Sequence, residues 1–189
     1  MSSGVLPREP PPGVVACNTG WRCCHRRCRS HKPGSFLRIP LADGSFGYAR
    51  TLEPPFDAFY EYRAAEPDAD LDRIASKPIL FRIVVSLPYS ESWKFIGWRK
   101  LEEHFSQPIV QYRQAVGPFG RCTIFDNLGM VRQAEPHECF GLEPSAVWDP
   151  HSVEERLLDA FMGRPNEALE HMKAELRNRI PPAGRGPGA

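Results

Sequence analysis

The side chains with the clearest chemical potential in this sequence are carboxylates gathered between residues 53 and 72. Seven of them fall in this stretch, against a single cation, Arg63. A field of like charges speeds association with a partner of opposite charge and disfavours wrong partners, so the stretch indicates an interaction face for a basic partner. The alternative is a solvated acidic loop. The residues that we expect to contact a partner are Glu61, Glu66, Asp68, Asp70 and Asp72.

The same segment contains Asp68-x-Asp70-x-Asp72, which has the spacing of the first ligands of an EF-hand loop. The glycine and the distal glutamate that complete such a loop are absent, so we expect no calcium site here.

A thiol and an imidazole lie two residues apart at Cys139 and His137. In an extended strand, residues i and i+2 share a face, so this pair could place a base beside a nucleophile. The alternative is a buried thiol beside a polar turn, because no third group nearby in the sequence would orient the imidazole. The G-x-S-x-G, Walker, G-x-G-x-x-G and H-E-x-x-H motifs are absent. We therefore expect a protein that is not an enzyme, with no catalytic residue and no cofactor.

Residues 1–32 differ in composition from the rest of the chain. They carry six Lys and Arg against Glu9, which leaves 18 cations and 22 acids in the remainder. Their cysteines and histidines could offer zinc ligands, but two of the cysteines are adjacent and the paired spacing of a structural site is missing, so we expect no metal. We expect residues 1–32 to be a disordered basic leader, or upstream sequence included by a mis-assigned start codon, and residues 181–189 to be a disordered tail. The candidate ligands are Cys17, Cys23, Cys24, Cys28, His25 and His31.

The sequence has no run of about 18 apolar residues and no apolar signal region at its start. We therefore expect a cytoplasmic protein that does not engage a membrane, with Cys122 and Cys139 as reduced thiols. Binding of nucleic acid by the folded body is disfavoured because phosphates need clustered cations. A small β-barrel that binds nucleic acid through the basic leader remains the alternative function.

The pattern of the chain after residue 33 predicts short strands followed by helices. Asp43-Gly44 predicts a type I′ hairpin turn between the first two strands, and Pro40 indicates an edge position or a bulge. Short helical turns are expected at Leu71–Ala75 and Glu102–Phe105. The predicted strands are Phe36–Leu41, Ser45–Leu52, Phe56–Tyr62, Pro78–Val85, Trp93–Trp98, Ile109–Gln114, Arg121–Asp126 and Met130–Ala134.

The C-terminal part of the chain has a helical period. Ser152-x-x-Glu155 predicts a capping box, and Gly163 predicts the end of that helix. A second helix follows Pro165. These signals predict an α+β, β-rich fold with a small antiparallel sheet or partly open barrel followed by two C-terminal helices, in one domain over residues 33–180. The apolar stripes are Val153, Leu157 and Phe161 in the first helix, and Leu169, Met172, Leu176 and Ile180 in the second.

The stretch Gly34–Arg50, GSFLRIPLADGSFGYAR, resembles the opening of the immunity protein 26 family of bacterial polymorphic toxin systems. Members open with a Gly-aromatic-hydrophobic-x-Ile-Pro-Leu strand, an Asp-Gly-type turn and an aromatic-rich return strand. The resemblance extends over roughly residues 33–165, through Pro78–Val85, Trp93–Gly97, Cys139–Glu143 and Ala146–Trp148.

This resemblance implies a β-rich cytoplasmic protein that binds and neutralises a cognate toxin, often a nuclease, without catalysis. A nuclease binds phosphate with cations, so the acidic residues 61–72 could face its basic surface by imitating the charge of nucleic acid.

Overall fold

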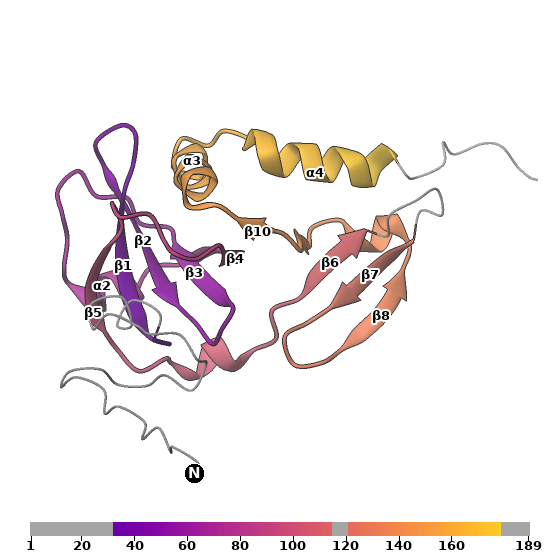
Figure 1. Ribbon diagram of the computed structural model, residues 1–189, viewed down its shortest axis with the longest axis horizontal. Coiled ribbons are helices and arrows are strands. Elements are labelled where there is room, and N and C mark those ends of the chain that lie inside the picture. Colours follow the sequence, from indigo (N-terminus) through magenta and orange to yellow (C-terminus); the bar gives the residue numbers. More distant parts are fainter. Residues whose placement is uncertain (1–31, 115–120, 179–189) are drawn as a thin grey trace, which may run out of the picture.

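The computed structural model of the chain describes residues 32–114 and 121–178, and these residues form two β-sheets connected by helices (Figure 1). The prediction of an α+β, β-rich fold is confirmed, although the strands form two sheets in place of one. The expected leader and tail lie almost wholly outside the described residues. No helix within the described part of the chain has the length and apolar character needed to cross a membrane.

The larger sheet has six strands in the order β10-β4-β3-β2-β1-β5. Its pairs are antiparallel except for β10, which lies parallel to β4. The strands are β1 (Ser35–Pro40), β2 (Phe46–Thr51), β3 (Phe56–Tyr60), β4 (Ile79–Val85), β5 (Lys94–Trp98) and β10 (Val147–Trp148).

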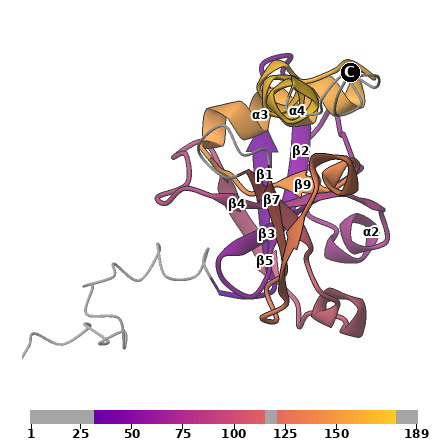
Figure 2. The same cartoon turned by 90° about the vertical axis from the view of Figure 1, so that its right-hand side faces the viewer.

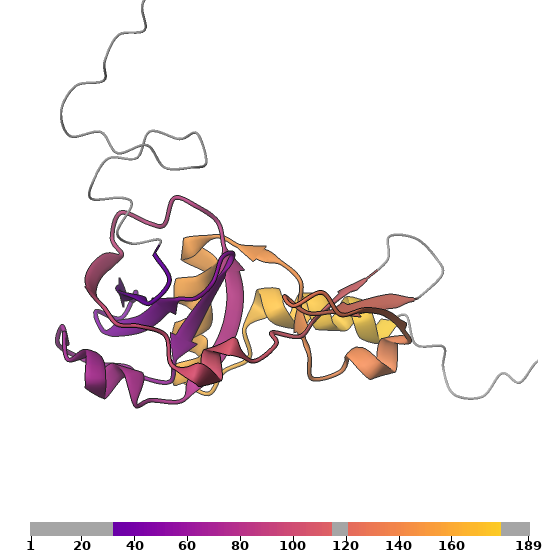
Figure 3. The same ribbon diagram turned by 90° about the horizontal axis from the view of Figure 1, so that it is seen from below.

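The smaller sheet has four strands in the order β8-β7-β6-β9, and β9 is parallel to β6. Seen from below in Figure 3, the two sheets lie side by side, and the segment that contains the 3-10 helix η1 (Glu103–Ser106) runs from one to the other. A second 3-10 helix, η2 (Pro136–Cys139), follows β8. The strands are β6 (Gln111–Gln114), β7 (Cys122–Phe125), β8 (Val131–Ala134) and β9 (Glu143–Pro144).

Strand alternation gives the larger sheet two different apolar faces. On one face, Leu37 and Ile39 of β1 pack with Val153 and Leu157 of α3 (Pro150–Phe161). On the other, Phe36 packs with Tyr48 and Tyr60 and with Ile74 of the short helix α2 (Leu71–Ala75). Figure 2 shows α3 together with α4 at the top of the molecule and α2 well away from them.

Helix α4 (Glu167–Asn178) ties the two sheets together. Leu169 and Met172 pack on the core of the larger sheet, whereas Leu176 is buried in the core of the smaller one. The predicted apolar stripe of this helix is therefore divided between two cores. Ile180, which was expected on the same stripe, lies outside the described residues.

Two local expectations were wrong, and a third, for Pro40, was right in part. The turn at Asp43-Gly44 is not type I′, which needs two positive φ angles, because only Gly44 has one (φ +81°). Strand β1 lies between β2 and β5, but β5 pairs only with Ser35–Arg38, so Pro40 has no strand partner on that side. The register of β1 shifts between Phe36 and Leu37, so the expected irregularity is in this strand but not at Pro40. Helix α3 begins earlier than predicted, because Asp149 accepts the Ser152 N–H (3.0 Å) and Pro150 fits the first turn.

Candidate functional site

The acidic segment, residues 61–72, leads from the end of β3 into helix α2. Its predicted helical turn at Leu71–Ala75 is confirmed, and Ile74 anchors it in the core with no exposed surface. Leu71 packs against β5 at Gly97, where an added Cβ would come within 2.6 Å of the leucine side chain. Apolar contacts thus hold one side of α2 to the sheet and leave its carboxylates on the other side.

Asp70 caps helix α2. Its side chain accepts the backbone N–H groups of Asp72 (3.1 Å) and Arg73 (3.0 Å), as short polar side chains do at helix starts. It also accepts a bond from the Arg73 guanidinium at 3.2 Å. The backbone N–H of Arg73, followed by the guanidinium, lowers the pKa of the Asp70 carboxyl below its usual range. Asp70 is therefore ionised at neutral pH and has a structural role.

Asp68 is held between two tyrosines. Its carboxylate accepts the Tyr62 hydroxyl (2.7 Å) and the N–H of Asp70 (2.9 Å), while its own N–H donates to the Tyr48 hydroxyl (2.8 Å). The Asp70 N–H, and after it Tyr62, lowers the pKa of the Asp68 carboxyl. Arg73 lies 3.6 Å away. Asp68 is thus largely satisfied by the protein itself, and little of its side chain is exposed.

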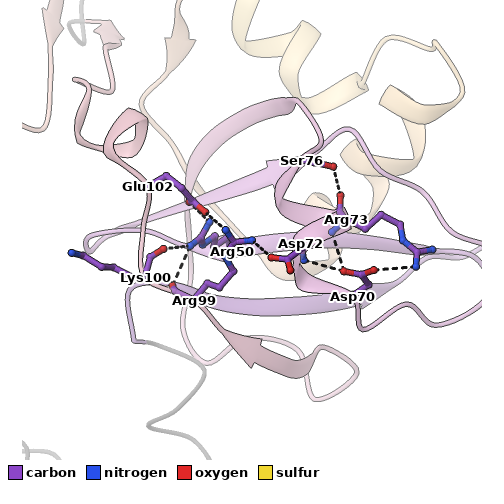
Figure 4. Close-up of polar contacts among 8 residues, drawn as sticks. All are labelled: Arg50, Asp70, Asp72, Arg73, Ser76, Arg99, Lys100 and Glu102. Atoms are coloured by element: carbon purple, nitrogen blue, oxygen red, sulfur yellow. Dashed lines mark hydrogen bonds and ion pairs between the residues drawn. The ribbon is translucent and has the colours of Figure 1, made fainter.

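Asp72 starts a polar chain that runs into the interior of the sheet. It pairs with Arg99, which lies 3.2 Å from Glu102, and Glu102 accepts a bond from Arg50 at 2.5 Å (Figure 4). Arg50 has no exposed surface and also donates to the carbonyls of Lys100 (2.7 Å) and Arg99 (3.1 Å).

The guanidinium of Arg50 also lies 4.6 Å from the Phe36 ring centroid and 5.2 Å from that of Phe105. Buried cations are usually held in this way, by carboxylate, carbonyl and aromatic partners together. The network therefore fixes the position of the acidic segment relative to the sheet.

Glu61 and Glu66 are exposed, and neither belongs to an ion pair among the described residues. Asp72 is also highly exposed, at 89% of its side chain, despite its contact with Arg99. Of the five predicted partner-binding residues, these three carry the carboxylates that are most available to another molecule.

Asp57 was counted with the acidic cluster, but the structure separates it. Only 2% of its surface is exposed, and β3 turns it toward the face that also bears Phe59, opposite helix α2. The alternation of β3 could have revealed this, because Asp57 shares its face of the strand with the apolar Phe59 and not with Phe56, Ala58 and Tyr60. The acidic cluster thus consists of two separate features.

Cys139 and His137 are not arranged as a nucleophile and a base. They lie in the 3-10 helix η2 and not in an extended strand, so His137 is exposed while Cys139 is fully buried. Burial, followed by the neighbouring Cys122, raises the pKa of the Cys139 thiol to about 12, which disfavours the reactive thiolate. Throughout the described ranges, no cluster of three His, Cys, Asp or Glu could hold a metal ion. The six candidate zinc ligands of the leader lie outside those ranges.

The sequence from Lys32 to Cys122 matches the model of the immunity protein 26 family, described as Immunity protein 26. Residues 32–122 belong to this family. The match spans a little under half of the chain and includes β1 to β6, helix α2, the acidic segment and Asp57. The resemblance predicted from the sequence extended to about residue 165, but the match does not include the part after residue 122.

No curated protein and no solved structure is significantly similar to the chain.

Proposed function

We propose that this chain is an immunity protein that binds and neutralises a cognate toxin of a bacterial polymorphic toxin system by non-catalytic contact. The observation that carries the proposal is the family match over residues 32–122. That segment contains both the acidic helix and the ion-pair network beneath it. Neutralisation would take place in the cytoplasm of the producing cell, where a nuclease or another intracellular effector would act.

The proposed interface is the acidic segment. Charge supports this choice: the described residues carry 22 acids against 17 Lys and Arg, so a basic partner is attracted from a distance. Within the interface, Glu61, Glu66 and Asp72 would meet the partner, while Asp68 and Asp70 hold the segment in shape. The five residues predicted to contact the partner thus divide into three that would contact it and two that support the segment.

Co-expression tests the function itself. We expect the gene immediately upstream to encode the toxin. The toxin domain should arrest growth when it is produced alone, and co-production of the full chain should restore growth. Arrest that persists while the chain is abundant and folded would contradict the proposal.

The interface is tested by neutralising its three available carboxylates. Glu61→Gln, Glu66→Gln and Asp72→Asn combined should slow association with the toxin domain about tenfold at low salt, and the difference should shrink as salt screens it. Glu91→Gln, Glu103→Gln and Glu167→Gln combined remove the same charge from exposed positions elsewhere. Equal association rates for the two triple variants would remove the acidic segment as the interface.

A further inference from the structure

A small cavity of about 170 Å³ lies beside the buried carboxyl of Asp57. Its walls are largely apolar and come from the β2–β3 connection and the segment after β4. Pockets for drug-sized ligands measure about 300–1,000 Å³, so this cavity suits a single side chain better than a small-molecule ligand. The cavity is lined by Thr51, Pro54, Pro55, Phe56, Asp57, Val85, Leu87 and Tyr89.

The carboxyl of Asp57 accepts hydrogen bonds from neutral groups. The Tyr89 hydroxyl lies 2.8 Å from each carboxylate oxygen, and the Thr51 hydroxyl is the second donor. Across the strand pair, β4 presents the apolar Ile83. Among the described residues no cation is paired with Asp57, although two carboxylate oxygens can accept about four hydrogen bonds.

Burial without a cation makes the ionised form of Asp57 costly. Desolvation raises its pKa to about 7, against the lowering effect of the Tyr89 and Thr51 bonds. A buried charge is stable when it is paired, so a cation that entered this cavity would give Asp57 the partner that the described residues do not provide.

We infer that this cavity receives one lysine side chain of the toxin, with its ammonium on Asp57 and its aliphatic stem along the proline and Leu87 walls. The inference rests on the proposed function and adds a second contact with the toxin, separate from the acidic segment. A lysine stem is apolar and its head is a compact cation with three donors, which matches apolar walls that end at a carboxylate. Leu87, which is 61% exposed at the rim, would be covered on binding.

The cavity can be tested on the full chain alone with n-butylammonium, which reproduces a lysine side chain. At pH 8 it should bind saturably and shift the side-chain ¹³C resonance of Asp57. The uncharged n-butanol should not do so. Because the cation binds the ionised carboxylate, the apparent affinity should fall about 30-fold between pH 8 and pH 5.5, as the ionised fraction falls. Equal responses to the amine and the alcohol, or binding that ignores pH, would overturn the inference.

The toxin supplies the second test. Asp57→Asn keeps the size of the side chain and should weaken toxin binding at pH 8 on the order of thirtyfold or more, as truncating a buried charge contact does. Glu53→Gln removes one exposed charge from the same connection and should leave affinity unchanged. If both variants bind like the wild type, the cavity is not a lysine site although the proposed function stands. If the wild type itself does not bind the toxin, the proposed function fails.

Discussion

Removing the carboxylate of Glu102 tests the network that holds the acidic segment on the sheet. Glu102→Ala leaves the fully buried Arg50 with two backbone carbonyls but without its anionic partner. Breaking a fully buried ion pair costs 3–5 kcal/mol, but these carbonyl bonds remain and the Glu102 side chain is 32% exposed, so we expect a loss of about 2 kcal/mol. Urea denaturation at pH 7 should show a lower midpoint with an unchanged m value.

Glu103→Ala is the matched control, because Glu103 is the exposed next residue, the first of the 3-10 helix η1, and has no ion pair among the described residues. It should change stability by less than about 0.5 kcal/mol. Equal losses for the two variants would refute the role given to Glu102.

The pH dependence gives a second measurement for Glu102. Burial raises the pKa of its carboxyl, but its own backbone N–H, Arg50 and Arg99 together lower it below the usual range. A lowered folded-state pKa contributes stability that is present above the unfolded value and is lost as pH falls through the folded value. The difference in free energy of unfolding between wild type and Glu102→Ala should therefore become smaller as the pH is lowered into the acid range.

Three further outcomes are expected, each measured by denaturation. Gly34→Ala should lower the free energy of unfolding by about 3 kcal/mol or prevent folding. The reason is that Gly34 has φ +91° and an added Cβ would lie 2.0 Å from the Arg99 carbonyl oxygen. A near-neutral effect would contradict this geometry. Asp70→Ala should cost about 1 kcal/mol through the lost cap of α2, and Asp70→Asn should recover most of it; if Asn fails to do so, the cap is not the cause. The pKa of the Asp57 carboxyl is raised in the folded state, so its contribution to the free energy of unfolding is present below the unfolded-state pKa near 4 and is lost as pH rises to about 7. The stability gain of Asp57→Asn over wild type should therefore grow between these two pH values. A constant gain would show that Asp57 does not titrate as described.

The local elements of this fold could be read from the sequence because their signals are local. Helix α2 was predicted at its observed bounds, because Leu71 and Ile74 lie three residues apart in a stretch with no other apolar pattern, and the structure adds Asp70 as its cap. The two-residue strands β9 and β10 were missed, because so short a strand has no periodicity of its own. Each is defined by parallel pairing with a strand far away in the sequence.

The candidate site was found only in part. A count of charges located the acidic segment, but it does not distinguish the two faces of β3 and therefore grouped the buried Asp57 with exposed carboxylates. The ion-pair network was also out of reach, because Arg50 and Glu102 are 52 residues apart and Asp72 and Arg99 are 27 apart. No spacing rule connects residues that meet only after the sheet has formed.

The most direct test of the proposed function is a titration of the purified toxin domain with the full chain while the activity of the toxin is followed. Non-catalytic neutralisation predicts a linear loss of toxin activity that ends at a fixed molar ratio, with both proteins chemically unchanged and recovered together in one complex. Full toxin activity at excess immunity protein would contradict the proposal, and so would inactivation at far less than that ratio, which would indicate turnover.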